Sequence, residues 1–185
     1  MTEQHDTLTE VEGKTDTNGQ AKYKYLCSGI GGIDSIYVKG QTPYDTATAT
    51  ITLKFGDFQL MTEGEHYDLV GAYGESGVNS QHRVNHYGTP RLIQKLKALA
   101  DSVHADSSYV LRINDMSLQC GGPFDIKNNW DTPHQNHREG VSADVDDIDK
   151  NKKRLPAEYL KKRLQIIEPK ASLGDEGNHY HVTIR

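Results

Sequence analysis

Apolar residues recur at helical spacing in two stretches of the chain. The first stretch follows Thr89-Pro90, and its apolar residues are separated by four, three and four positions, as on one face of a helix. Threonine as the N-cap residue and proline at the first helical position are typical of a helix start. The second stretch, 156–167, has similar spacing and is ended by Pro169, after which residues 170–178 are expected to form a loop. The pattern predicts two helices with buried faces, formed by Leu92, Leu96, Leu99 and Val103 in the first and by Tyr159 or Leu160, Leu164 and Ile167 in the second.

Alternation of apolar and polar residues predicts strands around these helices. Three strands, at 21–26, 33–38 and 46–55, follow one another closely and are separated by turns rich in glycine and asparagine. Two more are predicted, at 109–114 before the second helix and at 179–184 after it. The expected fold class is therefore α+β, a small antiparallel sheet with flanking helices, preceded by a partial all-β segment of sandwich type.

The composition divides the chain into four expected segments. Residues 1–13 are polar and are predicted to be a disordered tail, and 14–55 form the β segment. Residues 56–82 are rich in glycine and tyrosine and are expected to link the domains, and 83–185 are expected to form the second domain. His82 and His86 have no paired motif around them, so we expect them to be surface groups.

Charge and hydropathy exclude several functions. The 185 residues include 21 lysines and arginines against 26 aspartates and glutamates, a net charge of −5, so the chain offers no basic stripe for nucleic acid. No apolar run approaches the roughly 20 residues that cross a bilayer, and the N-terminus lacks a signal-peptide pattern. Cys27 and Cys120 lie in different expected domains, and both a disulfide and two free thiols stay open.

Metal-ligating side chains are concentrated in two stretches, 133–146 and 175–184. Nitrogen and oxygen ligands of this kind suit zinc at a catalytic site. His137 and Asp144 are seven residues apart, which is roughly 23 Å in an extended chain and about 10 Å in a helix. Because neither distance lets both side chains hold one metal, the chain must turn between them, and Gly140 provides the residue type that a sharp turn needs.

The second stretch places two histidines on one face of a strand. His179 and His181 are two residues apart, so both point to the same side and Tyr180 points to the other. One of the two histidines can complete a three-ligand site with His137 and Asp144, while the other faces the substrate.

These residues carry a family resemblance. The pattern His137-x-x-Gly140-x-x-x-Asp144 followed by His179-x-His181 resembles the metallopeptidases grouped with lysostaphin, the D-Ala-D-Ala peptidases and hedgehog. Three upstream elements extend the resemblance to the penicillin-insensitive murein endopeptidases over about residues 83–185. They are Asn114-Asp115-Met116-Ser117, Gly121-Gly122 and His134-x-x-His137.

The resemblance implies a role for each site residue. It implies that His137, Asp144 and His181 bind zinc, and that Glu176 and His179 are catalytic, Glu176 as general base and His179 as the group that stabilises the oxyanion or orients the water. It also implies a supporting set that touches the substrate or orients the ligands, namely His134, Asp115 and Ser117. Independently of the resemblance, Arg112 at the start of its strand can either bind a substrate carboxylate through two hydrogen bonds or pair with an acid.

Two departures from the murein endopeptidases bear on the substrate. Glu176 stands where those enzymes have a histidine, and the 37 residues from Asp144 to His181 are fewer than we expect for them. Both shift the resemblance toward the carboxypeptidase branch, so endopeptidase and D,D-carboxypeptidase activity both stay open.

A second resemblance concerns the N-terminal strands. The pattern Thr15-Asp16-x-Asn18-Gly19-Gln20-Ala21, then Gly32-x-Asp34-x-Ile36 and a Thr-Ala repeat, resembles the C-terminal half of a bacterial immunoglobulin-like domain of the invasin type. Such domains run to about 100 residues. With about 40 present, either the chain is part of a longer protein or these strands pack on the second domain as a β extension of the enzyme.

The resemblances together imply a zinc-dependent peptidase. Its expected partner is a peptide, in particular peptidoglycan stem peptides or cross-links, and its expected location is extracellular, periplasmic or at the cell surface. Two alternatives remain: a zinc-holding binding module without activity, and a fragment of a cell-surface adhesin in which the metal is structural.

Overall fold

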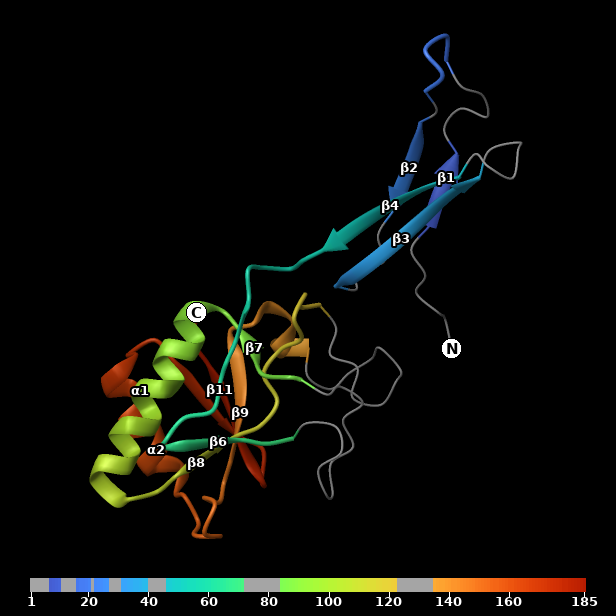
Figure 1. Cartoon of the computed structure of the whole chain (residues 1–185). Coiled ribbons are helices and arrows are strands. Elements are labelled where there is room, and N and C mark those ends of the chain that lie inside the picture. Colours follow the sequence, from blue (N-terminus) through green and yellow to red (C-terminus); the bar gives the residue numbers. More distant parts are fainter. Residues whose placement is uncertain are drawn as a thin grey trace. The chain divides into compact units, whose positions relative to one another are not determined.

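The computed structural model of the chain divides into two compact units, Met1–Leu53 and Lys54–Arg185. The structure describes residues 7–10, 16–20, 22–26, 31–39, 46–71, 84–122 and 135–185. Figure 1 shows helices and small, mainly antiparallel sheets, which confirms the predicted α+β class. Neither helix that the structure describes has the length and apolar character needed to cross a bilayer.

The first unit consists of antiparallel strand pairs. Strand β1 (Thr7–Glu10) pairs with β2 (Tyr23–Leu26), and β3 (Gly32–Lys39) pairs with β4 (Thr46–Leu53). The expected disordered tail is therefore interrupted by β1, because its Thr-Leu-Thr-Glu sequence alternates and finds a partner strand. The relation of this unit to an immunoglobulin-like domain stays a proposal.

The second unit is built on a five-stranded sheet with strand order β10-β11-β9-β8-β6. Neighbouring strands are antiparallel except β6 and β8, which are parallel. The strands are β6 (Tyr67–Leu69), β8 (Leu111–Ile113), β9 (Ser142–Asp146), β10 (Ser172–Asp175) and β11 (His179–Thr183). A separate short ribbon pairs β5 (Gln59–Leu60) with β7 (Tyr87–Gly88).

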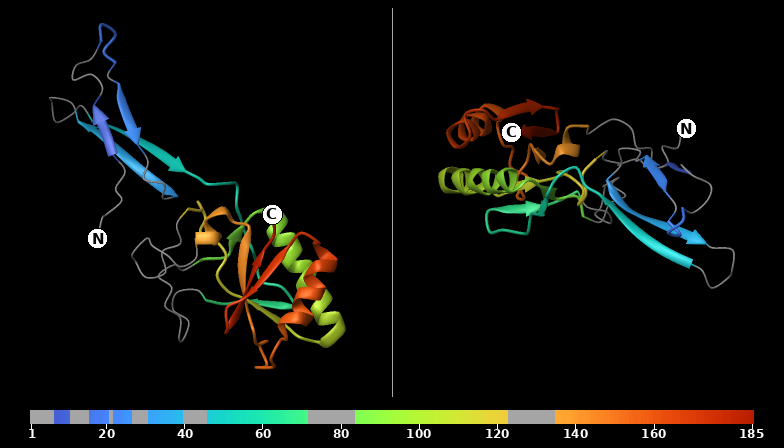
Figure 2. Two further views of the ribbon diagram at one scale, coloured as in Figure 1. Left: turned by 180° about the vertical axis from the view of Figure 1, so that it is seen from behind. Right: turned by 90° about the horizontal axis from the view of Figure 1, so that it is seen from above.

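Both helices lie together on one face of this sheet (Figure 2). Helix α1 (Pro90–Ser107) begins at Thr89, whose side chain accepts a hydrogen bond from the Leu92 backbone N–H at 3.2 Å, so the predicted cap is confirmed. Helix α2 is Ala157–Ile167. The predicted apolar faces are buried in the core with the inward side chains of the strands: Leu92, Leu96, Leu99, Val103, Leu160, Leu164, Leu111, Ile113, Val145, Tyr180 and Val182.

The other face of the sheet presents polar side chains. Since strand residues alternate between faces, the buried Ile113, Val145, Tyr180 and Val182 leave their neighbours pointing away from the helices. These neighbours include the charged and imidazole groups Arg112, Asp144, Asp146, His179 and His181. One face of the sheet therefore packs against the helices, and the opposite face carries the charged and imidazole side chains.

Two stretches expected to be irregular contain strands. Residues 59–60 and 67–69, within the expected linker, form β5 and β6, and β6 pairs with β8 in the main sheet. Residues 172–175 form β10, which makes a hairpin with β11. These strands are too short for their alternation to be visible in sequence, and β6 depends on a parallel, non-local partner. We therefore propose that the second domain begins near Lys54.

A chain that starts at Lys54 is expected to fold without the first unit. The described residues of the buried core cluster run from Met61 to Ile184, all within the second unit. Circular dichroism and thermal unfolding of the truncated and full chains test this expectation. A truncated chain that lacks helical signal, beside a folded full chain, would show that the second unit needs the first.

Candidate metal centre

His137 lies in a short 3-10 helix, Gln135–Glu139, that ends in a turn at Gly140. The backbone N–H of Gly140 donates to the His137 carbonyl at 3.1 Å. Gly140 has a φ of 63°, in the left-handed region that favours glycine. The turn that the spacing demands between His137 and Asp144 is thus present, and it leads the chain directly into β9.

The ring of Phe58 packs among three glycines, Gly56, Gly121 and Gly140. A methyl group added to Gly140 would lie 2.7 Å from Phe58 Cε1, and one added to Gly56 or Gly121 would lie 2.6 Å from the same ring. Glycine at these positions lets the ring approach the turn that carries His137. The sequence analysis did not include Phe58, since its partners are distant in the chain and no local pattern links them.

Gly140→Ala is expected to lower the free energy of unfolding by about 1–3 kcal/mol, because alanine is strained at this φ and its Cβ would clash with Phe58. Denaturant titration measures the change. Gly174→Ala is the matched control, since a Cβ there meets nothing closer than 3.9 Å. Equal losses in the two variants would mean that the turn geometry at Gly140 does not matter.

Asp144 is positioned by the backbone hydrogen bonds of β9. Its N–H donates to the Asp115 carbonyl at 2.8 Å, and its own carbonyl accepts from the Asn114 N–H at 2.7 Å. Both groups therefore point toward the β8 side, so the register pair of Asp144 with His181 on β11 is a non-hydrogen-bonded pair. In such pairs the side chains lie closest, which brings the carboxylate and the imidazole together.

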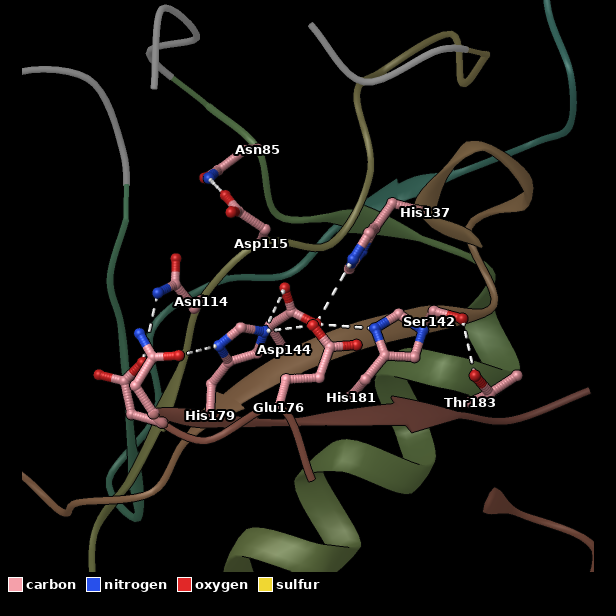
Figure 3. Close-up of polar contacts among 12 residues, drawn as sticks. Asn85, Asn114, Asp115, His137, Ser142, Asp144, Glu176, His179, His181 and Thr183 are labelled. Atoms are coloured by element: carbon pink, nitrogen blue, oxygen red, sulfur yellow. Dashed lines mark hydrogen bonds and ion pairs between the residues drawn. The ribbon is translucent and has the colours of Figure 1, made fainter. Parts of the chain in front are cut away.

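Three imidazoles surround the buried Asp144 carboxylate (Figure 3). Its Oδ1 lies 2.8 Å from His181 Nδ1 and 3.4 Å from His137 Nε2, and its Oδ2 lies 3.6 Å from His179 Nε2. The His137 and His181 rings meet edge to face at 5.0 Å. One ligand atom from each of His137, Asp144 and His181 lies within 4.8 Å of the others, so these residues could hold a metal ion.

The donor set is one that zinc accepts. Ligand atoms about 2.0–2.2 Å from a tetrahedral zinc lie roughly 3.3–3.5 Å apart, close to the 3.4 Å between His137 and Asp144, while His181 Nδ1 lies nearer to Asp144, at 2.8 Å. Two imidazole nitrogens and a carboxylate oxygen are a known catalytic zinc set. A divalent cation would also neutralise the Asp144 carboxylate, whose side chain is only 3% exposed.

Glu176 and His179 lie beside this cluster. Glu176 Oε2 is 3.2 Å from His179 Nε2, the ring nitrogen that also faces Asp144. The other ring nitrogen, Nδ1, is 2.8 Å from the Asn178 side-chain oxygen, which fixes the orientation of the ring. The Glu176 side chain is 53% exposed. The carboxylate therefore borders both the cluster and solvent, where a substrate would enter.

Asp175, the neighbouring acid, is placed differently. Its register partner on β11 is Tyr180, whose side chain is buried on the helix-covered face. Its Oδ1 accepts a hydrogen bond from the Gly177 N–H at 3.0 Å and so stabilises the hairpin turn. Gly177 has a φ of 95°, and this turn, not a long loop, presents Glu176.

Arg112 and Asn114 hold Asp146, which lies two residues beyond Asp144. Arg112 Nε is 3.3 Å from Asp146 Oδ2, and the Asn114 side-chain N–H donates to Oδ1 at 3.2 Å. Burial raises the pKa of the Asp146 carboxyl above its ordinary value, and the charge of Arg112 and the hydrogen bond from Asn114 oppose this rise. Asp146 is also the register partner of His179.

The remaining predicted residues have different positions. Asp115 accepts a hydrogen bond from the buried Asn85 side chain at 2.5 Å, and its carbonyl holds the Asp144 N–H (Figure 3). Ser117 is buried, and its carbonyl accepts the Tyr87 N–H. Asp115 therefore supports β9, and Ser117 is bonded to β7. His134 lies outside the described residues.

His86 is not a surface group, contrary to expectation. Its side chain is buried, and Nε2 lies 2.9 Å from the Val70 carbonyl and 3.2 Å from the Ile113 carbonyl. It joins the segment after β6 to the end of β8, a role that a single histidine in a glycine-rich stretch does not reveal. His82 lies outside the described residues.

Comparison with known families agrees with this geometry. The family model of penicillin-insensitive murein endopeptidases matches residues 58–174, a range that includes His137 and Asp144 and ends before Glu176 and β11. No curated protein matches the chain in sequence. Because the family match covers more than half of its length, the chain belongs to the penicillin-insensitive murein endopeptidase family.

Proposed function

We propose that this peptidase is zinc-dependent and hydrolyses a peptide bond in the stem peptides or cross-links of peptidoglycan. The observation that supports the proposal best is the convergence of His137, Asp144 and His181 on one sheet face, with Glu176 and His179 adjacent. We further propose that it acts outside the cytoplasm, in the periplasm or at the cell surface, where murein lies.

The metal ligands would be His137 Nε2, an Asp144 carboxylate oxygen and His181 Nδ1. Zinc, when bound, supplies Lewis-acid polarisation of the scissile carbonyl and of the attacking water. The rigid sheet register of Asp144 and His181 and the buried turn that carries His137 keep the three side chains preorganised.

Glu176 is the proposed general base. Its partly exposed Oε2 accepts a proton from the attacking water and returns it to the nitrogen of the leaving amine as the peptide bond breaks. His179 lies 3.2 Å from that oxygen and presents Nε2 on the same side, where it would orient the attacking water or, when Nε2 carries a proton, stabilise the oxyanion that develops on the carbonyl oxygen. Asn178 keeps the His179 ring in this orientation through Nδ1.

The number of ligands separates this proposal from a structural metal site. Structural zinc is usually closed by four protein ligands, whereas the described residues contribute three to this cluster. An inactive binding module would lack the base, and the chain has Glu176 beside the cluster. Both features favour an open, hydrolytic centre over the two alternatives.

Digestion of purified peptidoglycan, followed by mass analysis of the products, tests the proposal. The zinc-loaded chain is expected to release peptides whose masses identify the bond that is cleaved, and removal of the metal with a chelator is expected to stop release. Zinc restores it. Product masses distinguish loss of a terminal residue from cleavage of a cross-link, and a zinc-loaded chain that leaves peptidoglycan intact contradicts the proposal.

A further inference from the structure

A row of charged groups crosses the open face of the sheet beside the metal cluster. Arg112 on β8, Asp146 on β9 and His179 on β11 lie on this face, since their neighbours Ile113, Val145 and Tyr180 are buried in the core. Ile113 pairs with Val145, and Asp146 with His179, so the three strands bring the row together. The Arg112–Asp146 ion pair therefore lies on the His179 side of the cluster.

This ion pair adds little net free energy of folding, because it mainly offsets the cost of burying Asp146. The Arg112 side chain is 31% exposed, and partly exposed ion pairs contribute little to the free energy of folding. Asp146 is more buried, at 15%, and its ionised form is costly there unless a cation compensates it. Arg112 supplies that cation, and the pair holds the arginine side chain along the open face.

Most N–H groups of the Arg112 side chain remain available for a ligand. A guanidinium carries five N–H groups in a planar fork, and the structure describes a single ion pair for Arg112, through Nε, and no hydrogen bond. Its register partner on β6, Asp68, makes no ion pair with it. The arginine is thus oriented by one acid and still able to bind another carboxylate with two parallel hydrogen bonds.

The open face has one cationic side chain for an acidic substrate. In the five described strands of this sheet, the open face carries Asp68, Asp144 and Asp146, and Arg112 is its only lysine or arginine. A metal ion held by the cluster would offset the charge of Asp144, whereas Asp68 and Asp146 would still repel a carboxylate that did not contact Arg112. Apart from the metal site, Arg112 is therefore the strand residue on this face to which an anionic group of a peptide can bind.

The position of Arg112 limits where that anionic group lies on the substrate. Asp146 is two residues from Asp144 along β9, a separation of roughly 7 Å. A carboxylate bound to Arg112 therefore lies up to about two extended residues from a carbonyl held at the cluster. A residue within two positions of the scissile bond would carry it, either as a free C-terminal carboxylate or as a side-chain carboxylate.

We propose that Arg112, oriented by Asp146, binds a carboxylate of a residue within two positions of the scissile bond and so makes the enzyme selective for acidic peptides. The proposal rests on the peptidase function proposed above. It assigns Arg112 to substrate binding and Asp146 to positioning, with neither residue holding the metal.

Peptides that differ by one carboxylate test this selectivity. One pair of short stem-peptide analogues has a C-terminal carboxylate or carboxamide, and a second pair has a side-chain carboxylate or its amide. The full-length wild-type chain is expected to show a kcat/KM about 10- to 100-fold higher for the acidic member of one pair. This is the size of effect expected when the amide member cannot form the charged hydrogen bonds that the carboxylate forms. The pair that shows the preference identifies the source of the carboxylate.

Arg112→Met is expected to abolish this preference by losing activity on the acidic peptide while changing activity on the amide less than about threefold. Arg112→Lys keeps the charge without the fork and is expected to retain part of the preference. Arg163→Met is the matched control, because Arg163 pairs with Asp106 on the helix-covered side and should leave the preference unchanged. An Arg112→Met chain that loses activity equally on both members, or keeps the preference, overturns the proposal.

Failure of the peptidase function itself is recognised separately. If the wild-type chain cleaves no peptide and no peptidoglycan, binding of the same four peptides is measured by calorimetry with wild type and Arg112→Met. Tighter binding of the acidic member that disappears in Arg112→Met sustains the role of Arg112. Binding that does not depend on the carboxylate, or on Arg112, excludes that role.

Discussion

Glu176→Gln is expected to lower turnover of a peptidoglycan peptide by about 10²–10⁴-fold while the chain keeps its zinc, because this is the usual contribution of a general base. Glutamine keeps the size of the side chain and removes its capacity to accept the proton. Glu176 lies beside His179 and outside the cluster of three ligands, so metal content should stay at the wild-type level.

Asp175→Asn is the matched control for this loss. Both acids flank the same hairpin turn, but Asp175 is paired with the core-facing Tyr180 and caps the Gly177 N–H. Asparagine retains an oxygen that can accept the same hydrogen bond, so turnover is expected to change by less than about tenfold. Steady-state kinetics and metal analysis on both variants decide between the two acids. An active Glu176→Gln chain beside an inactive, zinc-loaded Asp175→Asn chain would reverse the assignment.

The elements with strong periodicity could be predicted from sequence. Helix α1 has a cap, a proline at its first position and a clear apolar face, and β11 alternates through its whole length. Strands β6 and β10 were missed because strands of three and four residues show little alternation, and their stability comes from partners elsewhere in the chain. Local pattern therefore identified the long elements and left out the ones that depend on tertiary pairing.

In the candidate site too, local sequence indicates some features, and others depend on contacts between distant segments. The family resemblance implied the ligand trio, and spacing alone left open which histidine of β11 completes it. The two-residue step on a strand and the turn at Gly140, which allow the three residues to meet, are local features. The sequence also pointed to Arg112, but not to its partner Asp146, because Arg112 and Asp146 are brought together by adjacent strands 34 residues apart. Packing of Phe58 beneath the His137 turn is likewise a consequence of the folded chain.

Alanine substitution of the two histidines of β11 is expected to have different effects on zinc content. His181→Ala is expected to lose zinc, whereas His179→Ala is expected to keep it, although both side chains lie on the same face of the strand. His181 Nδ1 is 2.8 Å from the Asp144 oxygen, while His179 Nε2 is 3.6 Å from the other oxygen and borders Glu176. Loss of a ligand should weaken zinc binding by more than the roughly 10–100-fold that loss of an outer partner costs.

Metal analysis after dialysis, with circular dichroism as a check of folding, measures this difference. Wild type and His179→Ala are expected to hold one zinc per chain, and His181→Ala and His137→Ala well below one. Added zinc should raise the unfolding temperature of the first two chains and leave that of the others nearly unchanged, because a ligand stabilises only a folded state that binds it. His137 is fully buried, so its substitution also creates a cavity, and the two partly exposed histidines of β11 give the cleaner comparison. Full zinc content in His137→Ala or His181→Ala would show that the metal is held elsewhere.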